Sequence, residues 1–447
     1  MTRDLLKIYN SLNRRKELFA PQEEGKVSLY VCGVTPYDAA HVGHGRCYVH
    51  FDVVQRLLRF LGYDVVYVRN ITDVDDKIIQ KAGSNDLKAI AQVADKHFKA
   101  FEKDMEKLNV QVPCKQPSVS KGIDQIIELI STLLEKGAAY KVANDVYFDI
   151  SSYASYGALS GKKVDELIAG ARIEVRSVKK HEGDFALWKG NDTQDFWQAP
   201  WGGYGRPGWH IECSSFIQSE LGETIDIHGG GIDLIFPHHE NERAQSESAT
   251  GASLVKYWMH NAHVTLHKEK MSKSSGNFFT LADVFETFDP MVVRFYLLQH
   301  HYRTPLDFSY DSLKASEKAY KKLIKVFHAQ KDQRMLYKDI ASDDRYAPYL
   351  DALLDDFNTP KFLGLLFAQL SSIQSCVEQK SVLAALLRIV LGLSCHEFSS
   401  TKAIGLTDEV RELIARRDKA RQEKRWEEAD ALREQLHALG YKAVDKK

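Results

Sequence analysis

The sequence predicts an α/β fold built on a parallel sheet, with an α+β insertion in the sheet domain and a C-terminal α-helical bundle after it. Three observations lead to this expectation. Strand-like apolar segments alternate with helical patterns in the first part of the chain, the middle mixes helices with short strands, and the last part is almost wholly helical. Strands that alternate with helices favour a doubly wound parallel sheet, because each helix carries the chain back across one face of the sheet.

Four strand-like segments define the predicted sheet, at 26–32, 64–68, 224–228 and 257–263. The first is followed by apolar residues at helical spacing, namely Val49, Val53, Val54, Leu57, Leu58 and Leu61. Gly62 closes this pattern, as glycine commonly does at the end of a helix. A strand that turns into a helix in this way is typical of a Rossmann-like, nucleotide-binding sheet.

The domain organisation follows from changes in pattern along the chain. We expect residues 1–110 and 201–265 to form two halves of the sheet domain, with an inserted connective domain at 111–200 that includes a strand at 145–150. A loop region follows at 266–311, and a helical domain is expected at 312–447. Apolar residues of that domain recur at helical spacing, as in Leu353, Leu354, Phe357, Leu363, Leu366, Phe367, Leu370, Leu383, Leu386, Leu387, Val390 and Leu391. This spacing is typical of a helix bundle.

Composition excludes several classes of protein. The 447 residues carry 60 basic and 61 acidic side chains, so any contact with nucleic acid must come from local basic patches. No apolar run is long enough to span a membrane, and the N-terminus lacks the apolar core of a signal peptide. The six cysteines are scattered, which argues against a disulfide framework. We therefore expect a cytoplasmic protein with reduced thiols and no membrane partner.

Two short strings have the chemistry of a phosphate-binding device. His41-Val42-Gly43-His44 lies where the first strand turns into a helix, and a helix N-terminus offers free N–H groups and a positive dipole to phosphate. Gly43 lets a flat base approach the backbone closely. The second string, 270–274, places the ammonium groups of Lys270 and Lys273 on a polar loop that can close over phosphates.

Together these strings resemble the signature of class I aminoacyl-tRNA synthetases, with Val42 in place of the more usual isoleucine. The resemblance implies that His41, His44, Lys270 and Lys273 act on the phosphates of ATP, with Lys273 the larger contributor. It also implies that Gly43, Gly231 and Asp233 bind the nucleotide, the Asp233 carboxylate through the ribose hydroxyls, and that Mg²⁺ accompanies ATP.

Four residues form a candidate metal site. His238 and Glu242 are four apart, which puts both side chains on one face of a helix that Pro237 is expected to begin. Cys32 ends the first strand, and Cys213 follows a loop rich in glycine and tryptophan. Two thiolates, an imidazole and a carboxylate suit zinc. The spacing alone leaves open that the cysteines are buried apolar groups and that His238 and Glu242 are a surface pair.

These four positions match the zinc ligands of cysteinyl-tRNA synthetases, residue by residue. The strings 30–33, 208–214 and 226–231 surround the amino-acid pocket in that family, and all are present here. The resemblance implies one Zn²⁺ per chain and a cysteine pocket lined by Gly33, Thr72, Trp209 and His228. Without it, Thr72 would suit a helix cap, Trp209 a loop anchor and His228 a buried strand end.

The resemblance implies a cysteine–tRNA ligase that activates L-cysteine with ATP and transfers it from cysteinyl-adenylate to the terminal ribose of tRNA(Cys). Zinc would select the thiol, because a soft metal binds a thiolate more strongly than an alcohol, and no editing domain is then expected. In this family 266–311 holds the mobile loop and contacts the tRNA stem. The motif 430–433 and the basic side chains before it indicate an anticodon-binding domain: Arg416, Arg417, Lys419, Arg421, Lys424 and Arg425. We expect a monomer.

Two other functions remain open. A related ligase joins cysteine to an amino sugar by the same adenylate chemistry, and a catalytically silent zinc protein could bind RNA. The helical domain with its basic run favours tRNA over the amino sugar, and intact His41, His44 and Lys273 count against a silent protein. Two motifs are set aside: the glycine-rich segment 203–208 is expected to be a loop, and the acidic residues Asp73, Asp75 and Asp76 are expected at a helix start.

Overall fold

The structure is a computed structural model, and it describes residues 6–161, 179–266, 269–270, 279–328, 330 and 334–397. Towards the C-terminus it describes 412–413, 415–417, 419–420, 423 and 425–438. The chain divides into two compact units. One combines Met1–Val284 with Pro290–Glu397, and the other combines Phe285–Asp289 with Phe398–Lys447.

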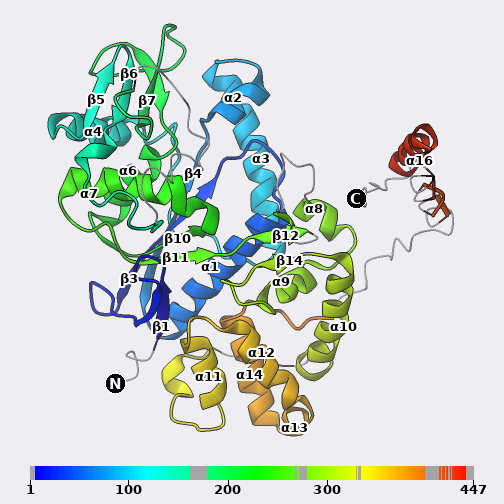
Figure 1. Ribbon diagram of the computed structural model, residues 1–447. Coiled ribbons are helices and arrows are strands. Elements are labelled where there is room, and N and C mark those ends of the chain that lie inside the picture. The colour runs from blue at the N-terminus through cyan, green and yellow to red at the C-terminus, as the bar shows by residue number, and fades with distance from the viewer. Residues whose placement is uncertain are drawn as a thin grey trace. The chain divides into compact units, whose positions relative to one another are not determined.

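A four-stranded parallel sheet lies at the centre of the first unit (Figure 1). Its strands are β3 (Lys26–Val34), β4 (Asp64–Ile71), β10 (Ile225–Gly231) and β11 (Val255–Asn261), in the order β11-β10-β3-β4. All three neighbouring pairs are parallel. Helix α1 (Val42–Phe60) connects β3 to β4. The predicted α/β fold with a parallel sheet is therefore confirmed.

Three strands, β3, β4 and β10, extend further at their carboxyl ends than the sequence predicts, whereas β11 ends two residues earlier. Strand β10 continues through Gly229 and Gly230 to Gly231, three residues beyond the expected end, and these residues pair with β11. Glycines are required here by close packing. A Cβ at Gly229 would lie 2.2 Å from the ring of Phe51 on α1. The weak strand propensity of glycine is thus outweighed by the contact between the helix and the sheet.

The inserted segment forms a second sheet of five antiparallel strands, with the order β5-β6-β7-β9-β8. Its elements are α4 (Ile123–Glu135), β5 (Ala139–Val142), β6 (Asp145–Phe148), β7 (Phe185–Asn191), β8 (Trp197–Gln198) and β9 (Tyr204–Pro207). The segment before α4 stays with the parallel sheet, since Lys115 and Ser118 form parallel bridges to Val68 and Ile71 of β4. The division of the chain at residues 110 and 201 remains a prediction.

The glycine-rich segment 203–208 is a strand rather than the expected loop. Its residues Tyr204–Pro207 form β9, which pairs with both β7 and β8. The glycines permit close approach of neighbouring groups: a Cβ at Gly205 would lie 2.3 Å from Nε1 of Trp188. A Cβ at Gly208 would lie 1.9 Å from the carbonyl oxygen of Ala186. Sequence patterns treat glycine as a turn signal, whereas here glycine makes room for buried neighbours.

Helices follow the parallel sheet. They are α9 (Pro290–Leu298), α10 (Tyr310–Phe327), α11 (Ala347–Leu354), α12 (Thr359–Ala368), α13 (Leu370–Ser375) and α14 (Val377–Ile389). The predicted apolar positions Leu353, Leu363, Leu366, Leu383 and Leu386 are all buried. These helices group with the sheet in the first compact unit. The second unit contains α16 (Trp426–Ala438).

The described residues form further strands and helices. They are β1 (Lys7–Asn10), β2 (Arg15–Leu18), α2 (Asp76–Ala82), α3 (Leu87–Lys107), α6 (Ile211–Leu221), α7 (Glu240–Thr250), β12 (Val264–Leu266), β13 (Glu269–Lys270), α8 (Leu281–Phe285) and β14 (Leu306–Asp307). None of the described helices is both long and apolar enough to cross a membrane.

A buried ion pair holds α1 against the helices of the first unit. Arg294 of α9 donates to the Asp52 carboxylate of α1 at 2.5 Å and to the carbonyl oxygen of Leu108 at 2.8 Å. It also donates to the carbonyl oxygen of Leu391, beyond α14, at 2.7 Å. One guanidinium therefore connects four chain segments, which holds the helix that begins at the His41 string in place.

His50 of α1 provides a test of acid stability. Burial lowers the pKa of His50 well below its ordinary value, and the charges of His301 and Arg46 lower it further. The unfolded chain takes up this proton below about pH 6.5 while the folded chain does not, so stability falls as the pH falls. His50→Phe, which retains an aromatic ring for the stack on Tyr302, is expected to lose less stability than the wild type between pH 7 and pH 5.5. Thermal unfolding at both values measures this, and equal losses would contradict it.

Candidate active site

The predicted site residues lie at the carboxyl edge of the parallel sheet. Cys32 and Gly33 are among the last residues of β3, Thr72 directly follows β4, and His228 and Gly231 belong to β10. Ligands of open α/β sheets bind at this edge, because the loops that leave it can surround a cavity. The sheet therefore gathers residues that are far apart in the sequence.

The four candidate metal ligands come together in the interior. Donor atoms of Cys32, Cys213, His238 and Glu242 all lie within 4.8 Å of one another, and all four residues are buried. Nε2 of His238 is 3.0 Å from Oε1 of Glu242 and 3.6 Å from Sγ of Cys213. Sγ of Cys32 is 3.5 Å from the same carboxylate oxygen. Ligands of a tetrahedral zinc ion are separated by roughly 3.3 to 3.8 Å, so this donor set fits zinc in both chemistry and size.

Different local structures present these ligands. Cys213 lies in the first turn of α6, and Glu242 lies in the first turn of α7. Phe236 has extended backbone angles (φ −138°, ψ 133°), and the residues after it are helical, so helical backbone begins at Pro237 as expected and continues into the regular α-helix α7 at Glu240. Because the backbone is helical from Pro237 onward, the spacing of four brings His238 against Glu242.

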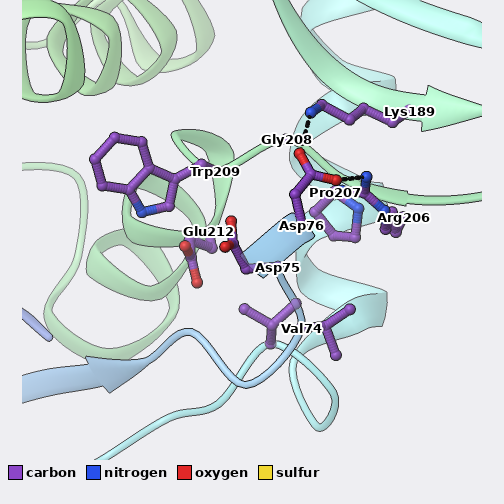
Figure 2. A pocket seen from close by; sticks show the side chains of 10 residues that line it. Val74, Asp75, Asp76, Lys189, Arg206, Pro207, Gly208, Trp209 and Glu212 are labelled. Carbon is purple, nitrogen blue, oxygen red and sulfur yellow. Dashed lines mark hydrogen bonds and ion pairs between the residues drawn. The ribbon is translucent and has the colours of Figure 1, made fainter. Parts of the chain in front are cut away.

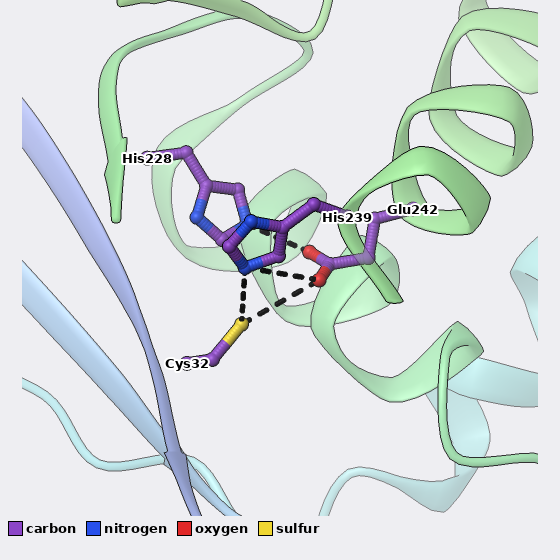
Figure 3. Close-up of side chains that lie close together, drawn as sticks. All are labelled: Cys32, His228, His239 and Glu242. Atoms are coloured by element: carbon purple, nitrogen blue, oxygen red, sulfur yellow. Dashed lines mark hydrogen bonds and ion pairs between the residues drawn. The ribbon is translucent and has the colours of Figure 1, made fainter. Parts of the chain in front are cut away.

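A second group of side chains overlaps the first. Cys32 and Glu242 also meet His228 and His239, and Figure 3 shows the two imidazoles pointing towards the thiol and the carboxylate. Nε2 of His228 is 2.7 Å from Oε2 of Glu242, and Nε2 of His239 is 3.2 Å from Sγ of Cys32. His239 in turn contacts His260, with Nδ1 and Nε2 2.8 Å apart. The sequence prediction missed His239 and His260, although His239 stands directly beside a predicted ligand.

The buried groups of the cluster shift one another's pKa values strongly. Burial alone would raise the pKa of Glu242, but His228 and His238 outweigh it and hold that pKa well below its ordinary value. Burial would lower the pKa of His238, yet the Glu242 carboxylate and Cys213 raise it to about 10. For Cys213, burial is likewise overcome by hydrogen bonds from Cys32 and His238, which lower its pKa to about 6. The charged forms of Glu242, His238 and Cys213 are therefore stabilised, whereas burial, together with Cys213 and Glu242, raises the pKa of Cys32 well above its ordinary value.

The predicted cysteine pocket adjoins this cluster. Trp209 packs its ring on His238, with centroids 4.2 Å apart, and remains 42% exposed. Together with Glu212 it lines a small cavity of about 30 Å³ (Figure 2). Thr72 is buried and donates a hydrogen bond to Oε1 of Glu212 at 2.7 Å. The sequence prediction placed Thr72 here and missed Glu212, its hydrogen-bond partner.

Gly33 is required by the close approach of two strands. Its N–H donates to Oδ1 of Asn70 at 2.7 Å, and a Cβ at this position would lie 1.6 Å from the carbonyl oxygen of Asn70. The pairing of β3 with β4 is also irregular between Val31 and Val34. No side chain fits, so the backbone of Gly33 is held at the edge of the pocket.

Two of the acidic residues after β4 stabilise the start of α2. Asp75 caps α2 by accepting a hydrogen bond from the N–H of Lys77, and Asp76 lies in the first turn. Asp76 also forms ion pairs with Lys189 and Arg206 of the inserted sheet, as Figure 2 shows. The expectation of a helix start is confirmed for Asp75 and Asp76, whereas the Asp73 carboxylate accepts hydrogen bonds from Ser120.

The first phosphate-binding string caps α1. His41 is the N-cap residue, and its Nδ1 accepts from the N–H of His44 at 3.2 Å. Nδ1 of His44 accepts from the N–H of His41 at the same distance, so the two imidazoles form a capping box. Their rings stack with centroids 3.8 Å apart. A Cβ at Gly43 would lie 2.9 Å from the His41 ring, which explains the glycine between them.

The structure describes some of the other residues that the resemblance assigns to nucleotide binding. Gly231 ends β10 and Asp233 lies in the 3-10 turn that follows, Ile232–Leu234. A Cβ at Gly231 would lie 2.5 Å from the Asp233 carboxylate, so the glycine makes room for that group. Lys270 is the last residue of β13, but its side chain and all of Lys273 lie outside the described residues.

The basic run before 430–433 is only partly available for RNA. Arg417 is buried, and Arg425 forms ion pairs with Glu423 and Glu428. Arg416 and Lys419 are exposed. Arg421 and Lys424 lie outside the described residues.

Comparisons with known proteins match both the sheet-containing part of the chain and its C-terminal part to one family of enzymes. The model of the class I (C) tRNA synthetase catalytic domain matches residues 18–318, and the cysteinyl-tRNA ligase anticodon-binding domain matches 404–447. A cysteine–tRNA ligase of Shewanella sediminis is 44% identical over 98% of this chain and 97% of its own length. One of Syntrophobacter fumaroxidans is 42% identical over 99% and 98%.

Solved structures share the fold at much lower identity. Methionyl-tRNA synthetase of Mycobacterium tuberculosis, in complex with methionyl-adenylate, has a TM-score of 0.57 at 16% identity, over 83% of this chain and 90% of that one. The leucyl enzyme of Agrobacterium radiobacter, in a ternary complex with tRNA, has the same TM-score at 12% identity, over 84% of each chain. The chain therefore belongs to the cysteine–tRNA ligase family of class I aminoacyl-tRNA synthetases.

Proposed function

We propose that this protein activates L-cysteine with ATP and transfers it to tRNA(Cys), with zinc selecting the thiol. One observation carries the proposal: two thiols, an imidazole and a carboxylate converge at the carboxyl edge of a class I parallel sheet. Full-length relatives named cysteine–tRNA ligase support the reaction. A ligase that acts on tRNA also agrees with the expected cytoplasmic location.

Of the two overlapping donor sets, Cys32, Cys213, His238 and Glu242 suit zinc better. This set includes both thiols, and soft sulfur ligands favour zinc. His228 contacts Oε2 of Glu242, whereas His238 and Cys32 face Oε1. His228 therefore fits the role of a residue that orients the Glu242 carboxylate and is not itself a metal ligand. When bound, zinc would favour ionisation of the substrate thiol and bind its sulfur.

In the first reaction the cysteine carboxylate attacks the α-phosphorus of ATP in line, and pyrophosphate leaves. Charge develops on the phosphoryl oxygens, so the protein acts mainly by positioning and neutralisation. We assign His41 and His44, with the N-terminus of α1, to the phosphates in the transition state. Lys270 and Lys273 are assigned to the β- and γ-phosphates, and Asp233 to the ribose. Mg²⁺ is expected to accompany ATP.

In the second reaction a terminal ribose hydroxyl of tRNA attacks the cysteinyl-adenylate, and the class I relationship favours the 2′-OH. The match of residues 404–447 to an anticodon-binding domain supports tRNA as the acceptor over an amino sugar. The match of residues 18–318 to a catalytic domain leaves less support for a catalytically silent protein. The monomeric state remains a prediction.

Cysteine-dependent exchange of pyrophosphate into ATP tests the first reaction. We expect exchange with cysteine and far more than about a hundredfold less with serine, because an apolar pocket alone separates such close analogues by about a hundredfold. Charging of a tRNA(Cys) transcript, with another tRNA and an amino sugar as alternative acceptors, tests the second. Release of serine from serine-charged tRNA(Cys) is expected to be negligible. Absence of cysteine-dependent exchange, or transfer to the amino sugar alone, would contradict the proposal.

A further inference from the structure

Arg46 lies two residues after His44, and neither the metal site nor the assigned phosphate contacts give it a role. We infer that Arg46 is a positioning residue for adenylate formation. It fixes strands β12 and β14, and through them the backbone of Lys270, in relation to the helix start that carries His41 and His44. The inference rests on the proposed function, because it assumes that both strings act on the phosphates of ATP.

The Arg46 guanidinium is buried and binds backbone carbonyl oxygens of two separate segments. The residue is 3% exposed. Its Nη1 donates to the carbonyl oxygen of His263 at 3.2 Å, and its Nη2 donates to those of His301 and Tyr302, also at 3.2 Å. Nη2 contacts the carbonyl oxygen of Thr304 as well. A hydrogen bond from a charged donor is about twice as strong as a neutral one, so this side chain joins the two segments firmly.

The carbonyl oxygens lie where β12 and β14 begin to pair. The N–H of Leu306 donates to the His263 oxygen at 3.1 Å, and the N–H of Ala262 donates to the Tyr302 oxygen at 2.8 Å. Arg46 therefore binds two oxygens that already join these segments, one from each of them. Beyond this point the two strands run parallel. The guanidinium thus fastens the beginning of the strand pair to α1.

Strand β12 in turn determines where the backbone of Lys270 lies. Strand β13 pairs antiparallel with β12, and its Lys270 lies opposite Thr265. A strand that is paired in register cannot shift without its neighbour, because the ladder of hydrogen bonds fixes both. The attachment of β12 to α1 through Arg46 is therefore passed on to the beginning of the second string.

The chain after the second string is attached to the same helix start. The N–H of Val42 donates to the carbonyl oxygen of Phe279 at 3.2 Å, and the N–H of Leu281 donates to that of Ala40 at 2.8 Å. These bonds lie on either side of the N-cap residue of α1. The two strings are thus linked twice, directly after the second string and through Arg46 before it.

This arrangement separates the expected effect on ATP from the effect on cysteine. Groups that act on a phosphoryl transfer have to be closely placed, and a misplacement of about 1 Å can cost about a hundredfold in rate. The carbonyl acceptors of Arg46 belong to the segments of β12 and β14, and none of them comes from a candidate metal ligand or a predicted residue of the cysteine pocket. Loss of Arg46 should therefore impair the use of ATP and spare cysteine binding.

Arg46→Met tests the inference, because methionine keeps much of the apolar stem and has no hydrogen-bond donor. We expect kcat/KM for ATP in pyrophosphate exchange to fall about tenfold to a hundredfold, with the KM for cysteine and the zinc content unchanged. Arg46→Lys keeps the charge but loses the planar fork, so its kcat/KM is expected between those of the wild type and Arg46→Met. Wild-type ATP kinetics in Arg46→Lys would overturn the inference even if Arg46→Met failed to fold.

Arg56→Met is the matched control for general damage to α1. Arg56 lies on the same helix, is 8% exposed, and donates to the carbonyl oxygen of Asn109 at 2.8 Å and to the Asp52 carboxylate at 2.7 Å. Its replacement is expected to lower thermal stability and to leave the constants for ATP and cysteine unchanged at a temperature where the variant is folded. An equal fall in kcat/KM for ATP would overturn the inference, since weakening of the helix would then be sufficient to cause it.

A combined variant tests whether Arg46 acts through the second string. If it positions Lys270 and Lys273, its removal should cost little once their ammonium groups are gone. In a Lys270→Met/Lys273→Met background, Arg46→Met is therefore expected to slow single-turnover adenylate formation by no more than about twofold. A loss as large as in the wild-type background would overturn the inference.

An inhibitor without phosphates shows which part of ATP depends on Arg46. Adenosine is expected to inhibit the wild type and Arg46→Met equally, because the strings are assigned to the phosphates. Parallel weakening of adenosine and ATP would overturn the inference, since Arg46 would then shape the whole nucleotide site. A wild-type protein without cysteine-dependent exchange would instead refute the proposed function, which distinguishes the two failures.

Discussion

Replacing Cys213 with serine is expected to reduce cysteine-dependent pyrophosphate exchange more than about a hundredfold and to remove the bound zinc. Loss of a residue that merely orients a metal ligand typically costs 10- to 100-fold in metal affinity or activity, and loss of a ligand is expected to cost more. Burial would raise the pKa of Cys213, but hydrogen bonds from Cys32 and His238 lower it, which favours a thiolate that a serine hydroxyl cannot imitate. Metal analysis of the purified variant and exchange kinetics measure both effects.

Cys114→Ser is the matched control for this experiment. Cys114 is exposed and lies outside the cluster, so its replacement should retain one zinc per chain and normal exchange. Cys213→Ser protein that keeps both its zinc and its preference for cysteine over serine would contradict the assignment of this residue. Retained zinc with lost activity would favour the second donor set, which contains Cys32, His228, His239 and Glu242 but not Cys213.

His44→Gln is expected to slow adenylate formation by about 10²- to 10³-fold while leaving thermal stability nearly unchanged. Glutamine at the third position of a helix can accept the N–H of the N-cap residue, so the capping box with His41 is preserved. The imidazole assigned to the phosphates is lost, and removal of one preorganised donor typically costs this much in rate. Single-turnover formation of cysteinyl-adenylate gives the rate, and thermal unfolding gives the stability.

His44→Ala separates the two roles of this residue. Alanine lacks both the imidazole and the acceptor for the N–H of His41. The same loss of rate should therefore come with a loss of about 1 kcal/mol in the free energy of unfolding. His328→Gln, at the C-cap of α10, serves as a control with no expected change in rate. A normal rate in His44→Gln with a slow rate in His44→Ala would show that only the cap matters.

The sequence predicted the class of fold because the periodicity of apolar residues is a local property. The alternation of strands and helices, the helix after β3 and the buried leucines of α11, α12 and α14 all follow from spacing within a few residues. The prediction was wrong for β9, where Gly205 and Gly208 leave room for Trp188 and Ala186. Such a glycine cannot be distinguished from a turn glycine without its neighbours.

Local spacing also explains how far the site could be predicted. The spacing of His238 and Glu242 correctly indicated a contact, and the backbone is helical from Pro237 as expected. The two cysteines are separated by 181 positions in the sequence, from 32 to 213, and only the family resemblance connected them. Their roles as ligands remain a proposal that the observed convergence supports.

By itself, the sequence determined the alternation of elements, the helix start at the His41 string and the residue types of a soft metal site. Only the tertiary structure decided which side chains contact each candidate site residue. It placed His228 on one oxygen of Glu242 and His238 on the other, and it joined Thr72 to Glu212. Hydrogen-bond partners across a sheet depend on how strands are ordered and paired, which is a long-range property, whereas helix and strand patterns depend on residues that are close in the chain.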